Sequence, residues 1–116
     1  MRPERFEEIV DEVFDKCRSM LIDKAKMYAH GGDRLSNFKR ASEFTGLPPA
    51  HTLLGFATKQ VVSIYDYTDD TAYDIKHTRE QWLEKMVDTI NYLGPLLLAL
   101  LEDEREIDFE YPKVSL

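Results

Sequence analysis

Hydrophobic residues recur with a helical period along most of the chain, most clearly in the stretch from Trp82 to Glu104. On a helix of 3.6 residues per turn, one arc of this stretch is apolar and consists of Leu83, Met86, Val87, Ile90, Leu97, Leu98 and Leu101. Glu84, Asp88 and Asn91 fall in a neighbouring sector about 60° wide. Because a buried carboxylate is costly unless a cation, a metal or a donor compensates it, this edge is a candidate metal or phosphate site.

Three further helices are predicted before this one. The first covers residues 3–28, where apolar residues are three or four positions apart and a proline occupies the first turn. The second covers residues 33–45, with an aspartate as its cap and a glycine after its end. The third covers residues 49–67, and residues 69–77 are expected to form a loop.

The last helix carries two strong local signals. Thr78 and Gln81 have the spacing of a capping box, which predicts that the helix starts there. Gly94 and Pro95 lie inside the helix, and we expect a kink because proline removes a backbone hydrogen bond. Residues 96–101 are apolar almost all round, which exceeds the needs of one core face and predicts a subunit interface.

These elements predict an all-α, antiparallel four-helix-bundle-like domain over residues 1–104, with one short extra helix and a C-terminal tail at 105–116. A chain of 116 residues can form one hydrophobic core but is too short for two ordinary domains. Its single cysteine, Cys17, belongs to the apolar pattern of the first helix and is expected in the core. We expect a homo-oligomer, a dimer or a tetramer.

Charge narrows the classes of partner. The chain has 15 basic and 22 acidic residues, a formal net charge of -7, which argues against binding to a nucleic-acid backbone. A free nucleotide stays possible, because a small phosphate ligand needs only a few cations or one divalent ion. No apolar run is long enough to span a membrane and the N-terminus lacks a signal segment, so we expect a cytoplasmic protein without membrane contact.

Several polar residues interrupt the apolar faces of the earlier helices. Lys24 lies in the middle of the first apolar arc, where it either extends to solvent or meets an anion inside the fold. Asn37 bonds either a substrate or the backbone. Lys59, Ser63 and Asp66 form one stripe that is either an ordinary surface feature or faces the acids of the last helix.

The acids of the last helix suggest a specific chemistry. Glu84 and Asp88 are four residues apart, so they can share a hard cation such as Mg²⁺, while lysine and asparagine side chains hold phosphate oxygens. Such a site supports metal-assisted hydrolysis of a phosphoanhydride. The alternative is that the two carboxylates pair with Lys24 or Lys59.

The ordered set of polar residues resembles a known family. The set reads Lys24-x-x-x-Tyr28, Asn37-Phe38, Lys59 and Glu84-x-x-x-Asp88-x-x-Asn91-Tyr92. It is similar to the small MazG-like proteins of bacteriophage genomes and to nucleotide-modification-associated domains, over residues 24–101. The resemblance implies an oligomeric, Mg²⁺-dependent nucleoside triphosphate pyrophosphohydrolase, located in the host cytoplasm where a phage encodes it.

The resemblance also implies roles for single residues. Glu84 and Asp88 correspond to metal ligands, and the residues implied in substrate binding are Lys24, Tyr28, Asn37, Lys59 and Asn91. The active relatives also carry a Glu-Glu-x-x-Glu cluster on the preceding helix, where this chain has Lys59, Gln60, Ser63 and Asp66. Three functions are therefore open: a pyrophosphohydrolase, a nucleotide-binding protein that sequesters its ligand without catalysis, and a structural helical oligomer.

Overall fold

The computed structural model describes residues 1–23 and 30–105, and this part of the chain contains helices and no strand. The elements are α1 (Pro3–Asp23), η1 (His30–Gly32), α3 (Ser36–Thr45), α4 (Pro49–Ala72), α5 (Arg79–Asn91), η2 (Tyr92–Leu96) and α6 (Leu97–Asp103). The predicted all-α, bundle-like class is thereby confirmed. None of the described helices combines the length and the apolar character that a bilayer crossing requires.

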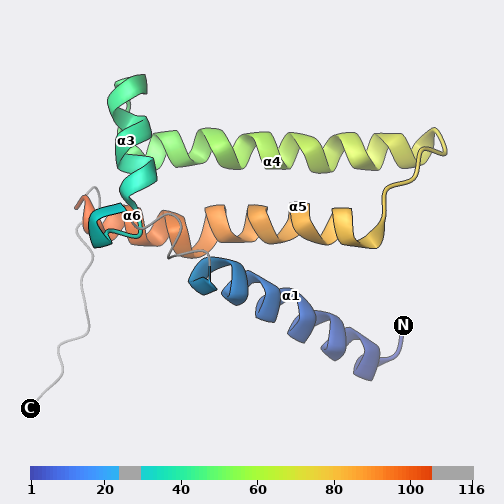
Figure 1. Cartoon of the computed structure of the whole chain (residues 1–116). Coiled ribbons are helices and arrows are strands. Elements are labelled where there is room, and N and C mark those ends of the chain that lie inside the picture. Colours follow the sequence, from blue (N-terminus) through green and yellow to red (C-terminus); the bar gives the residue numbers. More distant parts are fainter. Residues whose placement is uncertain (24–29, 106–116) are drawn as a thin grey trace, which may run out of the picture.

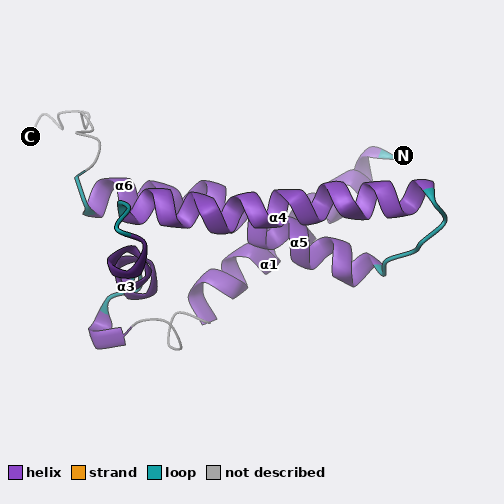
Figure 2. Cartoon of the chain, turned by 90° about the horizontal axis from the view of Figure 1, so that it is seen from above, coloured by secondary structure: helices purple, strands orange, loops and turns teal. Residues whose placement is uncertain are grey.

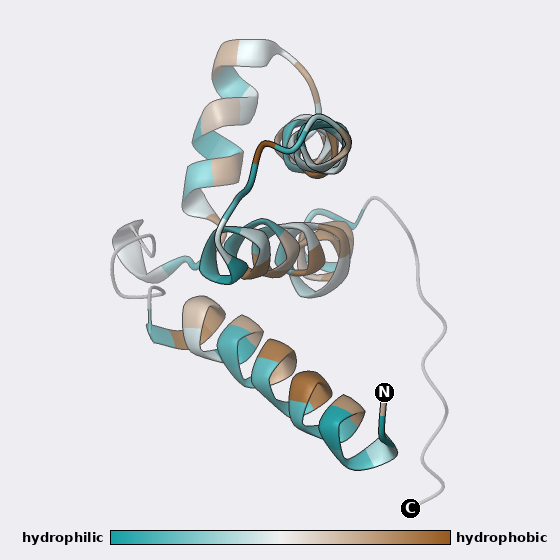
Figure 3. Ribbon diagram, turned by 90° about the vertical axis from the view of Figure 1, so that its right-hand side faces the viewer, coloured by the Kyte–Doolittle hydropathy of each residue, from teal (hydrophilic) through white to brown (hydrophobic). Residues whose placement is uncertain are grey.

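Helix α5 lies at the centre of the arrangement. It runs antiparallel to α4 on one side and packs against α1 on the other (Figure 1). Helix α1 crosses the α4–α5 pair at an angle (Figure 2), and the end-on view shows α1, α5 and α4 in succession (Figure 3). Helix α3 crosses one end of this layer, where it packs against α4. Because α4 and α1 cover two sides of α5, a functional site on α5 can form along its remaining edges.

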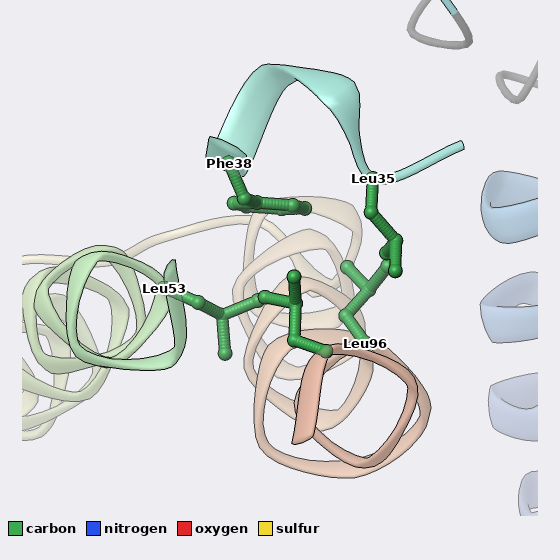
Figure 4. Close-up of a cluster of buried hydrophobic side chains, with 5 residues drawn as sticks. Leu35, Phe38, Leu53 and Leu96 are labelled. Atoms are coloured by element: carbon green, nitrogen blue, oxygen red, sulfur yellow. The ribbon is translucent and has the colours of Figure 1, made fainter. Parts of the chain in front are cut away.

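Two hydrophobic clusters hold these helices together. The larger cluster joins α3, α4 and the η2–α6 segment through Leu35, Phe38, Leu53, Leu96 and Leu100 (Figure 4). The smaller cluster joins α1 to α5 through Cys17, Leu83 and Val87. The smaller cluster thus holds α1 against α5, and the larger one holds α3 against α4 and the η2–α6 segment.

Local signals set two helix ends as predicted. At the start of α5, the Thr78 hydroxyl accepts a hydrogen bond from the Gln81 backbone N–H at 3.1 Å, and the Gln81 side chain accepts one from the Thr78 N–H at 2.9 Å. Both halves of the capping box are therefore formed. Helix α3 ends before Gly46, whose φ of 70° is the left-handed conformation that glycine adopts without strain.

Two other predicted boundaries were wrong. Helix α4 continues to Ala72, beyond its predicted end at residue 67, and the hydroxyl groups of Thr68 and Thr71 bond to carbonyls one turn earlier, at 3.0 Å each. Helix α3 starts three residues after the predicted cap, because Asp33 accepts a hydrogen bond from the Leu35 N–H (2.9 Å) in the turn before the helix. The predicted end of the first helix lies outside the described residues.

The interruption expected at Gly94 and Pro95 has a defined form. Pro95 lies within η2, a five-residue π-helical segment between α5 and α6. A π turn contains one residue more than an α-helical turn. Pro95 cannot donate a backbone hydrogen bond, and the wider turn allows the helix to continue without that bond. Helix α6 then continues to Asp103.

Ion pairs also connect separate helices. Arg79 donates two hydrogen bonds to the Glu12 carboxylate, at 2.7 and 2.6 Å, which joins α5 to α1 and lowers the pKa of Glu12. The Lys39 ammonium lies 2.5 Å from Asp103 and 2.6 Å from Asp33. The hydrogen bond to Asp103 is the main cause of a raised pKa of Lys39, and the bond to Asp33 raises this pKa further. Together the two bonds hold α3 against the end of α6.

Candidate functional site

A pocket of about 250 Å³ lies where the end of α1, the start of α3 and the α5–η2 junction meet. We call it the corner pocket. Its lining consists of Met20, Leu21, Arg34, Asn37, Phe38, Glu84, Asp88, Asn91, Tyr92 and Leu96. The pocket therefore combines two carboxylates, two amides and a guanidinium with aromatic and aliphatic side chains.

The polar side of the corner pocket follows one edge of α5. Glu84, Asp88 and Asn91 are separated by four and three residues, so they share a helix edge, as the sequence predicted. Their burial increases along the helix: Glu84 is exposed, Asp88 is half-buried and Asn91 is only 6% exposed. The rim of the pocket is thus acidic, and a buried amide lies deeper.

An aromatic group supports the other side of the pocket. The Phe38 and Tyr92 rings meet edge to face with centroids 6.3 Å apart, and Phe56 lies 6.2 and 6.4 Å from them. Such arrangements are favourable ring geometries and involve side chains with few rotatable bonds. Helix α3 therefore presents a firm apolar wall to the pocket.

Asn91 occupies the deepest polar position. Its side-chain N–H group donates to the backbone carbonyl of Cys17 on α1 at 3.3 Å, while its side-chain oxygen is buried and has no hydrogen-bond partner. Burial raises the pKa of the Cys17 thiol, and the negative charge of Asp88 raises it further. Asp88 and Asn91 therefore both approach α1 at Cys17.

Arg34 is a site residue that the sequence reasoning missed. Its Nε–H donates to the Leu21 carbonyl at 3.3 Å, which places the guanidinium between α1 and α3 in the pocket lining. Arg34 precedes α3 in a non-helical turn, whereas the sequence predicted it in the first turn of a helix over residues 33–45. The one available signal was a basic residue directly after the predicted cap, Asp33.

A second hollow of about 200 Å³ adjoins the corner pocket. It is lined by Lys16, Met20, Glu80, Glu84, Val87 and Asp88, and we call it the side hollow. Met20, Glu84 and Asp88 line both spaces. The acidic edge of α5 therefore lies along a depression that is longer than the corner pocket alone.

The structure brings together four of the seven predicted site residues. Asn37, Glu84, Asp88 and Asn91 line the corner pocket. Lys59 is exposed on α4 and does not line the pocket, and its carbonyl accepts a hydrogen bond from Ser63 at 3.1 Å. The other two predicted residues, Lys24 and Tyr28, lie outside the described part of the chain.

The carboxylates of the corner pocket fit a limited kind of metal site. Among residues 1–23 and 30–105, no group of three His, Cys, Asp or Glu side chains is placed to share an ion. Helix α4 contributes no carboxylate to the pocket lining. Mg²⁺ is commonly held by one or two carboxylates, several waters and the phosphates of a substrate, so Glu84 and Asp88 match a site that a nucleotide completes.

Comparison with known proteins gives no relative from which a role can be transferred. The chain matches no protein-family model, no curated protein and no solved structure.

Proposed function

We propose that this chain is a MazG-like, Mg²⁺-dependent nucleotide pyrophosphohydrolase that converts a nucleoside triphosphate to a monophosphate and pyrophosphate. The observation that supports it is the meeting of Asn37 with Glu84, Asp88 and Asn91 in one pocket, beside Arg34. The first four residues come from two helices that are far apart in the sequence, and the family resemblance assigned them to substrate and metal.

The side chains divide the work of binding. Arg34 can donate paired hydrogen bonds to phosphate oxygens, and Asn37 at the pocket rim can donate one more. Glu84 and Asp88 hold Mg²⁺, which when bound screens phosphate charge and activates water. Phe38 and Tyr92 offer an apolar wall for the base or sugar.

The size of the site indicates how a nucleotide lies in it. The corner pocket, at about 250 Å³, falls below the roughly 300 Å³ at which sites for drug-sized ligands begin. A whole nucleoside triphosphate therefore extends beyond it. The side hollow is the adjoining space, and it shares Glu84 and Asp88 with the corner pocket. We infer that the phosphate chain passes along this acidic edge, where the bound cation offsets the repulsion.

A second candidate function is binding without catalysis. The observation that favours it is that both carboxylates of the pocket come from α5 alone. Active relatives, by the resemblance, surround Mg²⁺ with carboxylates from two helices. A protein with half of that carboxylate set can still bind and sequester a nucleotide. It lowers the barrier to phosphoanhydride hydrolysis far less than a protein with the full set.

A thermal-shift panel of nucleotides, measured with and without Mg²⁺ and combined with a pyrophosphate assay, separates these functions. For the enzyme we expect at least one nucleoside triphosphate to raise the melting temperature mainly with Mg²⁺ and to release pyrophosphate. A nucleotide that raises the melting temperature without Mg²⁺ and yields no product supports sequestration. A panel without any shift or product contradicts both candidates and leaves the structural oligomer.

We also propose that the protein works as a homo-oligomer. Met86, Leu93 and Leu98 follow one another along α5, η2 and α6, and they are 40%, 46% and 57% exposed. Val62 and Tyr65 on the neighbouring α4 are also exposed. We call these five exposed side chains the apolar stripe. Exposed apolar side chains on neighbouring elements are typical of a protein interface, and a second copy of the chain offers the same side chains for symmetric burial.

Leu93→Glu tests this association. Because it places a charge within the stripe, we expect it to shift the protein toward the monomer in sedimentation-velocity experiments over a range of concentrations. Ile75→Glu is the matched control, since Ile75 is an exposed aliphatic residue in the α4–α5 loop. Equal oligomer content in the two variants would contradict the assignment of the interface to this stripe.

A further inference from the structure

Within the described part of the chain, the first half of helix α1 carries an apolar row that is largely uncovered. Phe6 and Phe14 are 61% and 59% exposed, and Val10 between them is half-buried. The three residues are four positions apart, so they form one ridge along the helix. Figure 1 shows this half of α1 diverging from α5, whereas Cys17 in the other half packs against α5. The ridge is therefore open to a partner.

The order of residues along this ridge is the same in both directions. With one further position at each end, four residues away, the ridge consists of Arg2, Phe6, Val10, Phe14 and Arg18. The Phe6 N–H donates to the Arg2 carbonyl at 3.2 Å, so Arg2 continues the helical register. A two-fold axis at Val10 brings Phe6 of one copy opposite Phe14 of another, and the reverse pair forms at the same time. The ridge is thus complementary to an antiparallel second copy of itself.

The charges beside the ridge support a second copy as the partner. The neighbouring row of α1 is acidic and consists of Glu7, Asp11 and Asp15, again four positions apart. Among the described residues, no ion pair involves these three acids or the two arginines of the ridge. On the side of α1 opposite the ridge, by contrast, Glu8 and Glu12 are each paired with an arginine. The ridge side therefore presents unpaired charges of both signs, which two copies can pair with each other.

Helix geometry brings the opposite charges of the two copies within reach. With the axis at Val10, Arg2 of one copy is level with Arg18 of the other, about 4.5 Å along the helix from Asp15 of that other copy. Arg18 is in turn level with Arg2, about 7.5 Å along the helix from Glu7. Because arginine has a long, flexible stem, each guanidinium can turn away from the other arginine and bond to the acidic row.

The size of such a contact determines how it operates. Helices that pack through ridges of this spacing cross at about −50°, so they touch over a few turns only. The second half of α1, with Met20 and Leu21 at the corner pocket, then stays on α5. Four phenylalanine rings bury at most about 250 Å² each, about 1,000 Å² in all, which is below the roughly 1,200 Å² of a stable interface. We therefore expect a weak contact, favoured at high concentration or between copies already joined elsewhere.

We propose that α1 is a second self-association surface, on which the ridges of two copies pack antiparallel about a two-fold axis at Val10. Arg2 and Arg18 of each copy bond to the acidic row of the other. This surface is distinct from the apolar stripe on α4, α5, η2 and α6. Two separate two-fold contacts on one chain are what joins dimers into a tetramer. The inference goes beyond the proposed nucleotide chemistry and does not depend on it.

Cysteine cross-linking of the full chain tests the position of the axis. We expect Val10→Cys to form an intermolecular disulfide on air oxidation, because the axis brings this residue opposite itself. A mixture of Phe6→Cys and Phe14→Cys should give at least about three times as much cross-linked dimer as either variant alone. Glu8→Cys is the matched control, two residues from Val10 but on the opposite side of α1. The wild type, whose single Cys17 is buried, gives the background.

Charge reversal tests the pairing of the two copies. We expect Arg18→Glu to weaken self-association about tenfold in sedimentation-velocity experiments, because the two-fold axis doubles the loss of each ion pair. Adding Glu7→Arg to this variant should restore the association. The two residues are about 16.5 Å apart along one helix, so a restored association reports a contact between copies. At high protein concentration, Leu93→Glu in the apolar stripe should leave the Val10→Cys cross-link in place.

Three results would overturn the inference, each in variants whose helix content by circular dichroism equals that of the wild type. The first is that Val10→Cys cross-links no more than Glu8→Cys. The second is that the mixture of the two phenylalanine variants gives no more dimer than they give separately. The third is that Arg18→Glu associates like the wild type or is not rescued by Glu7→Arg. A nucleotide panel without any shift would remove the proposed function and leave this surface unaffected.

Discussion

Leu100→Ala is expected to lower the free energy of unfolding by about 3 kcal/mol. Leu100 is 0% exposed and belongs to the larger core cluster, with Leu35, Leu53 and Leu96 around it. Removing three carbons from a site enclosed by α3, α4 and η2 leaves a cavity, because these elements are held by separate contacts and can close only in part. The change should also loosen α3, which carries one wall of the corner pocket.

Urea denaturation followed by circular dichroism measures this loss. Leu98→Ala is the control, because Leu98 lies two residues away on the same helix and is 57% exposed. We expect Leu98→Ala to cost less than about 0.5 kcal/mol in a dilute sample, where a subunit contact contributes little. A Leu100→Ala loss below about 1 kcal/mol would contradict the assignment of Leu100 to the centre of the core.

Local sequence signals predicted the helix ends that depend on nearby residues alone. The capping box at Thr78 and the glycine stop at Gly46 involve contacts within a few positions, so residue type and spacing suffice. The end of α4 was missed for the opposite reason. Thr68 and Thr71 lie on the exposed side of a helix that continues without a new large apolar residue, and a periodic pattern detects only the buried side.

The residues of the candidate site also fall into those that local sequence predicts and those that it does not. Glu84, Asp88 and Asn91 share one helix, so their common edge follows from spacing. Arg34 and the position of Lys59 depend instead on how separate elements pack. The fold brings the turn before α3 close to the end of α1, where Arg34 donates to the Leu21 carbonyl, while the rotation of α4 leaves Lys59 exposed. A sequence pattern carries no information about either arrangement.

Lys39 illustrates the same limit for electrostatics. It was not singled out in the sequence, yet it meets Asp33 before α3 and Asp103 at the end of α6. These partners are separated by most of the chain, and only the folded arrangement brings them to one ammonium group. The pair matters for the site, because it fixes the end of α3 that presents Asn37 and Phe38 to the corner pocket.

Glu84→Gln is expected to reduce pyrophosphate release at least about 100-fold, equivalent to about 2.7 kcal/mol of barrier, if the protein is the proposed enzyme. The substitution keeps the shape of the side chain and removes the negative charge that holds Mg²⁺ and its waters. Because Glu84 is exposed, the melting temperature should stay nearly unchanged. The Mg²⁺ concentration needed for half-maximal rate should rise together with the fall in kcat.

Glu80→Gln is the matched control for this loss. Glu80 lies one turn earlier on α5 and lines the side hollow but not the corner pocket, so removing its charge changes the general field along the edge without touching the direct metal site. We expect Glu80→Gln to retain at least about a third of the rate, a barrier change below about 0.7 kcal/mol. Equal losses in the two variants would show that the acidic edge acts only through its overall charge. Full activity in Glu84→Gln would remove Glu84 from the proposed metal site.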